Sequence, residues 1–292
     1  MTKIGRATAL IAICFILLAM LTGCGSDGEL GHGPRHEPET VTEQHLPRAV
    51  KIMIPEGRTL YRVAKSLEES GVCSAADFIE TVNSQSESNP FVFEIHNREE
   101  RPFLLEGYLF PGAYEFYVGE PSQRALDRLL SNTQKKLTTE YYARALQLGY
   151  SMDQIITIAS IIQTEVAIAA EMPFVASVLH NRLNSDNYLR KLQCDATYFY
   201  LRDHVYPFYR GDAEEVSEPL REKYDALYNT YRFNGLPAGP ICNPGKDAIE
   251  AALYPAETDY YYFVTDAAGR YHYNNSYEAH VALCKRFGIN SF

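Results

Sequence analysis

Residues 158–167 read "IASIIQTEVA", a run rich in isoleucine and alanine with one carboxylate, Glu165, near its end. At about 100° per residue, the stretch 153–171 predicts a helix with one broad apolar arc. The apolar arc contains Ile155, Ile158, Ala159, Ile161, Ile162, Val166 and Ala169. Glu165 falls inside this arc, whereas Gln163 and Thr164 fall outside it. The sequence therefore predicts a core helix that carries an acid on its buried face.

The position of Glu165 has two interpretations. A carboxylate among isoleucines loses hydration, which disfavours its charged form and raises its pKa. A raised pKa suits a general acid that must hold a proton near neutral pH. In the structural alternative, Glu165 lies at the edge of the apolar stripe and reaches water or pairs with an arginine such as Arg182. The helix alone leaves both interpretations open.

The composition indicates a soluble globular body, with 46% hydrophobic and 22% charged residues. A net charge of −10 argues against nucleic-acid binding, which needs clustered lysine and arginine. The 22 tyrosines combine an apolar ring with a polar tip, a combination that suits both a carbohydrate site and an ordinary core. No cysteine and histidine spacing is typical of a zinc site, and no metal or cofactor is expected.

The first 24 residues predict export from the cytoplasm. Two basic residues precede the apolar run 7–21, and the segment 1–24 ends in "LTGC", which resembles a bacterial lipobox. Cys24 is then the lipidated residue that anchors the protein to the extracytoplasmic face of the cell membrane. A retained transmembrane anchor is the alternative. Residues 25–49 are rich in Gly, Pro, Glu and His and predict a flexible linker.

A small unit is expected at residues 50–90. The stretch "VKIMI" (50–54) predicts a strand, and a turn then leads to a helix that is capped by Thr59 and stopped by Gly71. A second capped helix is expected over 74–83. This strand, helix, helix order resembles the LysM-like module of cell-wall proteins.

Residues 91–292 predict a larger mixed domain, so the fold class is α+β. Helices are expected near 122–147, 152–171 and 173–183. An aromatic hairpin is expected over 258–275 with its turn at Asp266–Gly269, followed by a closing helix at 276–287.

Several long motifs carry a family resemblance. They are "EGYLFPGAYEF" (106–116), "ASIIQTEVAIAAEMPFVASVLHNRL" (159–183), "LQCDATYFY" (192–200), "YNTYRFNGLPAGPICNPG" (228–245) and "TDYYYFVTDAAGRYHYNNSYEAH" (258–280). In this order they resemble the endolytic murein transglycosylase (YceG-like) family. The resemblance implies a LysM-like part and a catalytic domain, which cleaves nascent peptidoglycan strands at the membrane surface, with peptidoglycan synthases as further partners.

The resemblance also implies the roles of individual residues. The family has two glutamates two positions apart, and this chain has Gln163 at the first and Glu165, the implied catalytic acid, at the second. The implied reaction cleaves between N-acetylmuramic acid and N-acetylglucosamine and forms a 1,6-anhydro ring. The implied substrate-binding residues are Gln193, Asp195, Asn229 and Tyr231. The loss of the first glutamate leaves a catalytically silent peptidoglycan-binding lipoprotein as the alternative.

Two further expectations concern the same motifs. Family members carry a histidine where this chain has Tyr271, and the neighbouring His272 is expected to face the opposite side of its strand. Cys194 and Cys242 both lie in motifs that the resemblance assigns to the cleft, so a disulfide between them is a hypothesis.

Overall fold

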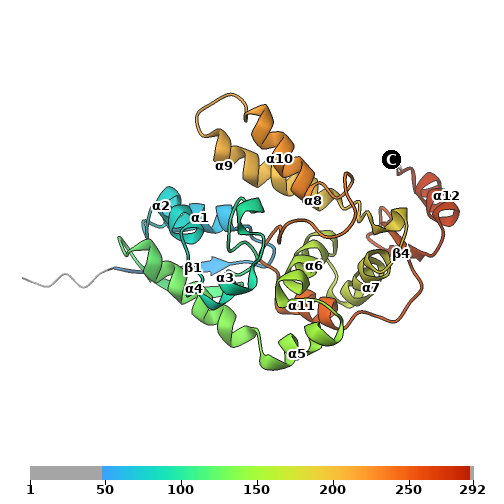
Figure 1. Cartoon of the computed structure of the whole chain (residues 1–292), viewed down its shortest axis with the longest axis horizontal. Coiled ribbons are helices and arrows are strands. Elements are labelled where there is room, and N and C mark those ends of the chain that lie inside the picture. Colours follow the sequence, from blue (N-terminus) through green and yellow to red (C-terminus); the bar gives the residue numbers. More distant parts are fainter. Residues whose placement is uncertain (1–47, 290–292) are drawn as a thin grey trace, which may run out of the picture. The chain divides into compact units, whose positions relative to one another are not determined.

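The computed structural model of the protein describes residues 48–289 (Figure 1). The expected signal segment 1–24, the lipidation residue Cys24 and nearly all of the expected linker 25–49 lie outside the described residues. Between residues 48 and 289, no helix is long and apolar enough to cross a membrane.

The fold of the described residues is mixed α+β and mostly helical, as the sequence predicts. The strands form two antiparallel pairs, β1 (Ala49–Ile54) with β2 (Gly112–Tyr117) and β3 (Tyr262–Thr265) with β4 (Tyr271–Asn274). The α-helices are α1 (Leu60–Glu69), α2 (Ala75–Asn83), α3 (Pro90–Glu94), α4 (Ser122–Lys136), α5 (Thr139–Gln147), α6 (Met152–Glu165), α7 (Met172–Leu183), α8 (Asp195–Tyr200), α9 (Tyr206–Arg210), α10 (Glu218–Tyr228), α11 (Lys246–Leu253) and α12 (Tyr277–Phe287). The shorter turns are η1 (Arg98–Glu100), η2 (Ala169–Glu171), η3 (Tyr188–Arg190) and the π-helical η4 (Leu201–Val205).

The N-terminal unit has the elements that the sequence predicts, a strand followed by two capped helices. Thr59 caps α1 by accepting from the Arg62 N–H. The strand β1, however, pairs with β2 at residues 112–117, and α2 packs against α4. Residues 50–90 therefore share their sheet and core with the chain that follows, and no LysM module is identified in the described residues.

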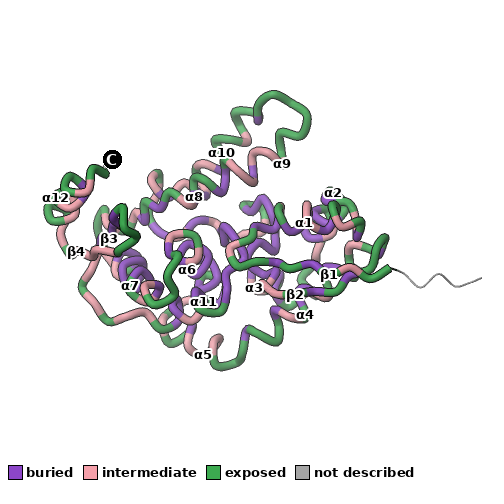
Figure 2. Tube along the Cα trace, turned by 180° about the vertical axis from the view of Figure 1, so that it is seen from behind, coloured by how far each residue is buried: buried purple, intermediate pink, exposed green. Residues whose placement is uncertain are grey.

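The helix α6 lies in the core and packs against α7 and α11 (Figure 1). Figure 2 shows α6 and α11 largely buried, whereas the connection between α9 and α10 is exposed. A reciprocal capping box of Ser151 and Gln154 starts α6. The helix ends at Glu165, because Val166 has an extended backbone, so the predicted end at residue 171 is wrong.

The structure divides one expected helix into two and contains the expected hairpin and closing helix. The helix expected over 122–147 is divided into α4 and α5, because Leu137 is extended and Thr138 caps a new helix. The expected hairpin is confirmed, with its turn at Asp266–Gly269, and so is the closing helix α12.

The segment 101–109 fixes the first turn of α6. Arg101 donates to both oxygens of the buried Asp153 at 3.0 and 2.5 Å, and the Tyr108 hydroxyl donates to Asp153 at 2.8 Å. Gly107 lies nearby at a φ of +89°, where a Cβ would be 2.6 Å from Pro240. This close approach requires glycine and brings the 240–245 loop onto α6.

Candidate active site

The last turn of α6 opens into a pocket of about 260 Å³. Its lining comes from α6, α7, the loop before α8, the β3 strand and α12. Of the predicted site residues, Glu165, Gln193, Asp195 and Tyr231 all line this pocket. The structure thus brings together side chains from segments that are far apart in the sequence, and their roles stay predictions.

Glu165 lies at the wall of the pocket and is partly exposed. Burial of its carboxyl group raises the pKa, the Asp195 charge adds to this rise, and a hydrogen bond of 3.5 Å from the Ala196 N–H opposes it. No ion pair of Glu165 is found within residues 48–289. A carboxyl group in this setting holds its proton to higher pH than an exposed one.

Arg182, the alternative partner expected for Glu165, binds backbone carbonyl groups instead. Its guanidinium donates to the carbonyls of Lys191, Leu192 and Tyr261 at 3.0, 2.9 and 2.6 Å. It also lies over the Tyr262 ring, 4.9 Å from the ring centroid. This buried cation therefore ties α7 to β3 and to the segment 191–195, which we call the strap.

The strap carries two of the predicted residues over the pocket. Its Gln193 has a φ of +53°, the only non-glycine residue with positive φ among residues 48–289. The Thr230 hydroxyl accepts from the Cys194 N–H at 3.0 Å and lies 3.1 Å from the Thr197 hydroxyl. These buried threonines hold the strap in the unusual conformation that places Gln193 and Asp195 at the pocket.

Asp195 and Tyr231 form a polar pair at the mouth of the pocket. The Tyr231 hydroxyl donates to Asp195 at 2.7 Å, and burial together with this carboxylate raises the pKa of Tyr231. Asp195 is the first residue of α8 and does not cap it, since the N-cap is Cys194. Asn229 does not line the pocket, because its side chain accepts from the Tyr231 N–H in a turn.

The hairpin supplies a contact that the sequence did not predict. The Tyr271 hydroxyl donates to the Glu165 carbonyl at 3.4 Å and accepts from the Ala167 N–H at 3.2 Å. His272 faces away, with its ring 3.0 Å from Asp266 and against Phe287. Tyr271 thus binds the backbone at the C-terminal end of α6.

Gln163 has a structural position. Its side-chain oxygen accepts from the N–H of Gly245, the N-cap of α11, at 2.8 Å, and it does not line the pocket. A glutamate at this position would offer the same acceptor. A carboxylate at position 163 would therefore lie outside the pocket that contains Glu165.

The expected disulfide between Cys194 and Cys242 is absent. Both are buried free thiols, and their sulfurs contact the carbonyls of Leu192 and Ser160 respectively. Cys194 lines the Glu165 pocket and Cys242 does not, so the two cysteines do not share the cleft that the resemblance implied. Across residues 48–289, no group of three or more His, Cys, Asp or Glu side chains is placed to hold a metal ion.

Comparison with known proteins identifies the family of this chain. A model of the YceG-like family matches residues 34–286, so the chain belongs to the YceG-like family. The endolytic murein transglycosylase of Streptococcus pneumoniae strain D39 is 28% identical over 272 residues, and that of Bacillus subtilis strain 168 is 28% identical over 239 residues. The crystal structure of a YceG-like protein from Listeria monocytogenes matches with a TM-score of 0.64 and 27% identity, covering 80% of this chain and 75% of that one.

The matches differ in length. The alignments cover 86% and 80% of this chain but only 46% of the Streptococcus pneumoniae protein and 63% of the Bacillus subtilis protein. The chain thus spans about half to two thirds of the length of these relatives.

Proposed function

We propose that this protein is a lytic transglycosylase that cleaves peptidoglycan glycan strands between N-acetylmuramic acid and N-acetylglucosamine. The observation that carries the proposal is the setting of Glu165: an accessible carboxyl group at the end of a core helix, with its pKa raised by burial. Two relatives named endolytic murein transglycosylase support the same reaction.

Glu165 alone can carry the proton transfers of this reaction. Its carboxyl group protonates the glycosidic oxygen, and the bond from that oxygen to the anomeric carbon of muramic acid breaks. The resulting carboxylate then takes the proton of the muramoyl 6-hydroxyl, whose oxygen attacks the same carbon and closes the 1,6-anhydro ring. No water is consumed, and Glu165 regains its proton. The reaction therefore does not require the second carboxylate that activates a water molecule in many hydrolases.

The other pocket residues bind and stabilise the strand in this proposal. The Asp195 carboxylate, held by the Tyr231 hydroxyl, offsets positive charge that develops at the anomeric carbon. Gln193 offers amide donors and acceptors to the acetamido groups of the sugars. Internal cleavage, action on nascent strands beside peptidoglycan synthases, and tethering by a lipid on Cys24 belong to the same proposal.

The test is product analysis with purified peptidoglycan. The full chain in detergent is incubated with long glycan strands, and mass spectrometry identifies the new ends. We expect 1,6-anhydro-muramoyl ends from the native protein and none from Glu165→Gln, with products of intermediate length early in the reaction. Reducing ends, heavier by one water, would indicate a hydrolase. No cleavage together with retained strand binding would indicate the silent binding protein.

A further inference from the structure

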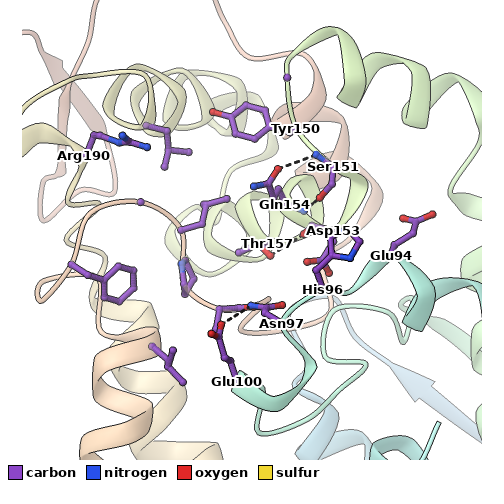
Figure 3. Close-up of a pocket in the computed structure, with 18 of the residues that line it drawn as sticks. Glu94, His96, Asn97, Glu100, Tyr150, Ser151, Asp153, Gln154, Thr157 and Arg190 are labelled. Atoms are coloured by element: carbon purple, nitrogen blue, oxygen red, sulfur yellow. Dashed lines mark hydrogen bonds between the residues drawn. The ribbon is translucent and has the colours of Figure 1, made fainter. Parts of the chain in front are cut away.

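A second and larger cavity lies at the opposite end of α6 from Glu165 (Figure 3). It has a volume of about 860 Å³, in the range of sites that bind small molecules. Polar and aromatic side chains from α3, the first turns of α6 and the loops at 148–151 and 233–238 surround it. Its residues include Glu94, His96, Glu100, Tyr150, Arg190 and Leu236.

The strap separates this cavity from the pocket of Glu165. Lys191 bridges to Gly235, whose N–H donates to the Arg190 carbonyl at 2.8 Å. Arg190 and Gly235 line the large cavity, whereas residues 192–195 of the strap line the Glu165 pocket. Asp153 in the cavity and Glu165 are about 18 Å apart along the axis of α6, at about 1.5 Å per residue.

Charges of opposite sign line the cavity. Figure 3 shows Arg190 and Glu94 on opposite sides of it, with Glu100 between them at the lower edge. Among residues 48–289, Arg190 and Glu94 have no ion-pair partner, although the Tyr142 hydroxyl hydrogen-bonds to Glu94. Glu100 receives an amide hydrogen bond of 3.2 Å from Asn97. The Asp153 carboxylate is neutralised by Arg101. The charges that lack an ion-pair partner thus match a ligand that carries both a carboxylate and an ammonium group.

We propose that this second cavity binds the stem peptide of the strand whose glycan occupies the Glu165 pocket, an inference that rests on the proposed function. A stem peptide carries free carboxylates and the amine of a diamino acid. Arg190, next to the strap, binds a carboxylate. Glu94, on the side opposite Arg190, and Glu100 bind the amine. An extended peptide of about five residues reaches roughly 17 Å, close to the separation of the two sites.

The first test measures binding of a free peptide, without catalysis. A synthetic tetrapeptide of L-alanine, γ-D-glutamate, L-lysine and D-alanine is titrated calorimetrically into the full-chain Glu165→Gln protein. We expect Arg190→Glu to weaken binding by about tenfold or more, because a charge-assisted contact is replaced by repulsion. Arg124→Glu, an exposed arginine of α4 outside the cavity, is the matched control and should leave binding unchanged.

The acidic side is tested with the same titration. Acetylation of the peptide's lysine, or the double variant Glu94→Gln and Glu100→Gln, should each weaken binding by about tenfold. Absence of peptide binding by the parent protein, or equal binding by Arg190→Glu and Arg124→Glu, would overturn the proposal. Equal binding of the acetylated peptide would overturn the assignment of the amine to Glu94 and Glu100.

The second test separates this inference from the proposed function. Cleavage rates are compared on intact strands and on strands stripped of stems by an amidase. Arg190→Glu should lower kcat/KM about tenfold on intact strands and leave it unchanged on stripped strands. Cleavage without peptide binding would refute only the inference, and peptide binding without cleavage would refute only the proposed function.

Discussion

Two glutamates, Glu165 and Glu106, both have a raised pKa but differ in solvent access and in hydrogen bonding. Glu165 lies at the end of α6, lines a pocket and accepts one long hydrogen bond. Glu106 is 1% exposed, and burial raises its pKa from 4.5 to about 8. Its oxygens accept from the Leu60 N–H at 2.8 Å and from the Asn243 amide and the Tyr200 hydroxyl at 3.3 Å.

The comparison shows that desolvation alone does not identify a catalytic acid. Burial shifts the pKa of both carboxyl groups upward, but three donors bind the oxygens of Glu106 and join α1, α8 and the 240–245 loop through it. Glu165 keeps free lone pairs and access to solvent. A shifted pKa together with an unsaturated, accessible carboxyl group therefore distinguishes the site from the core.

The largest expected effect is on cleavage by a matched pair of variants. Glu165→Gln should lower the rate of glycan cleavage roughly 10⁴-fold, about 5.5 kcal/mol in activation free energy, because one group supplies both proton transfers. Glu106→Gln should leave the rate within about threefold. Initial rates with folded variants, verified by circular dichroism, test this pair. An equal loss in both variants would remove the distinction between the two acids.

The second expected effect is a pH dependence of the free energy of unfolding, caused by Glu106. Its pKa in the folded protein lies above that of the unfolded chain, so the folded state binds more protons between these values and stability falls as pH rises. Between pH 4.5 and pH 7 this decrease amounts to about 3 kcal/mol in the free energy of unfolding. Glu106→Gln should remove it, because the amide keeps an acceptor for Leu60 and cannot ionise.

Urea unfolding of both proteins at several pH values provides the measurement. The difference in unfolding free energy between the native chain and Glu106→Gln should change steadily in favour of the variant as pH rises. A difference that is independent of pH would mean that Glu106 has an ordinary pKa in the folded protein. Glu165→Gln provides the same comparison for a partly exposed acid. The difference in unfolding free energy between the native chain and this variant should depend less on pH.

A smaller effect tests whether Asp195 shapes the acidity of Glu165. The Asp195 charge helps to raise the pKa of Glu165, so Asp195→Asn should lower that pKa. Glu165 acts as the acid, and the alkaline limb of kcat/KM against pH should therefore move to lower pH, with about a tenfold loss of rate at neutral pH. Tyr231→Phe removes the hydrogen bond but keeps the charge, so it should not move this limb downward.

The sequence predicted those parts of the site that depend on local pattern. The apolar periodicity placed Glu165 on the buried face of α6, and hydroxyl caps placed the starts of α1 and α2. The motifs identified the strap. The positive φ of Gln193, however, depends on the hydrogen bond between the Cys194 N–H and Thr230, which lies far along the chain. Tertiary contacts of this kind leave no periodic signal.

Contacts between distant residues also explain other features that local patterns do not show. The pairing of β1 with β2 joins residues on both sides of the expected boundary at residue 90, so a local strand and two helices resembled a separate module. The end of α6 at Glu165 follows from the extended Val166, where apolar residues continued to favour a helix. The Asn229 side chain accepts from the Tyr231 N–H in a turn, and its role in substrate binding stays a prediction.

The smallest expected effect tests a carboxylate at position 163, where this chain has glutamine. In Gln163→Glu the carboxylate still accepts from the Gly245 N–H, and it adds a like charge near Glu56, whose carboxyl group lies against Gly245. We expect less than about 1 kcal/mol of destabilisation, reduced by salt, and cleavage within about twofold of native. Gln163→Leu, which removes the acceptor, should cost more stability, about 1 kcal/mol or above, with the same cleavage rate. Thermal unfolding and initial rates measure both variants, and a tenfold gain of activity in Gln163→Glu would show that Glu165 is not the only carboxylate the chemistry can use.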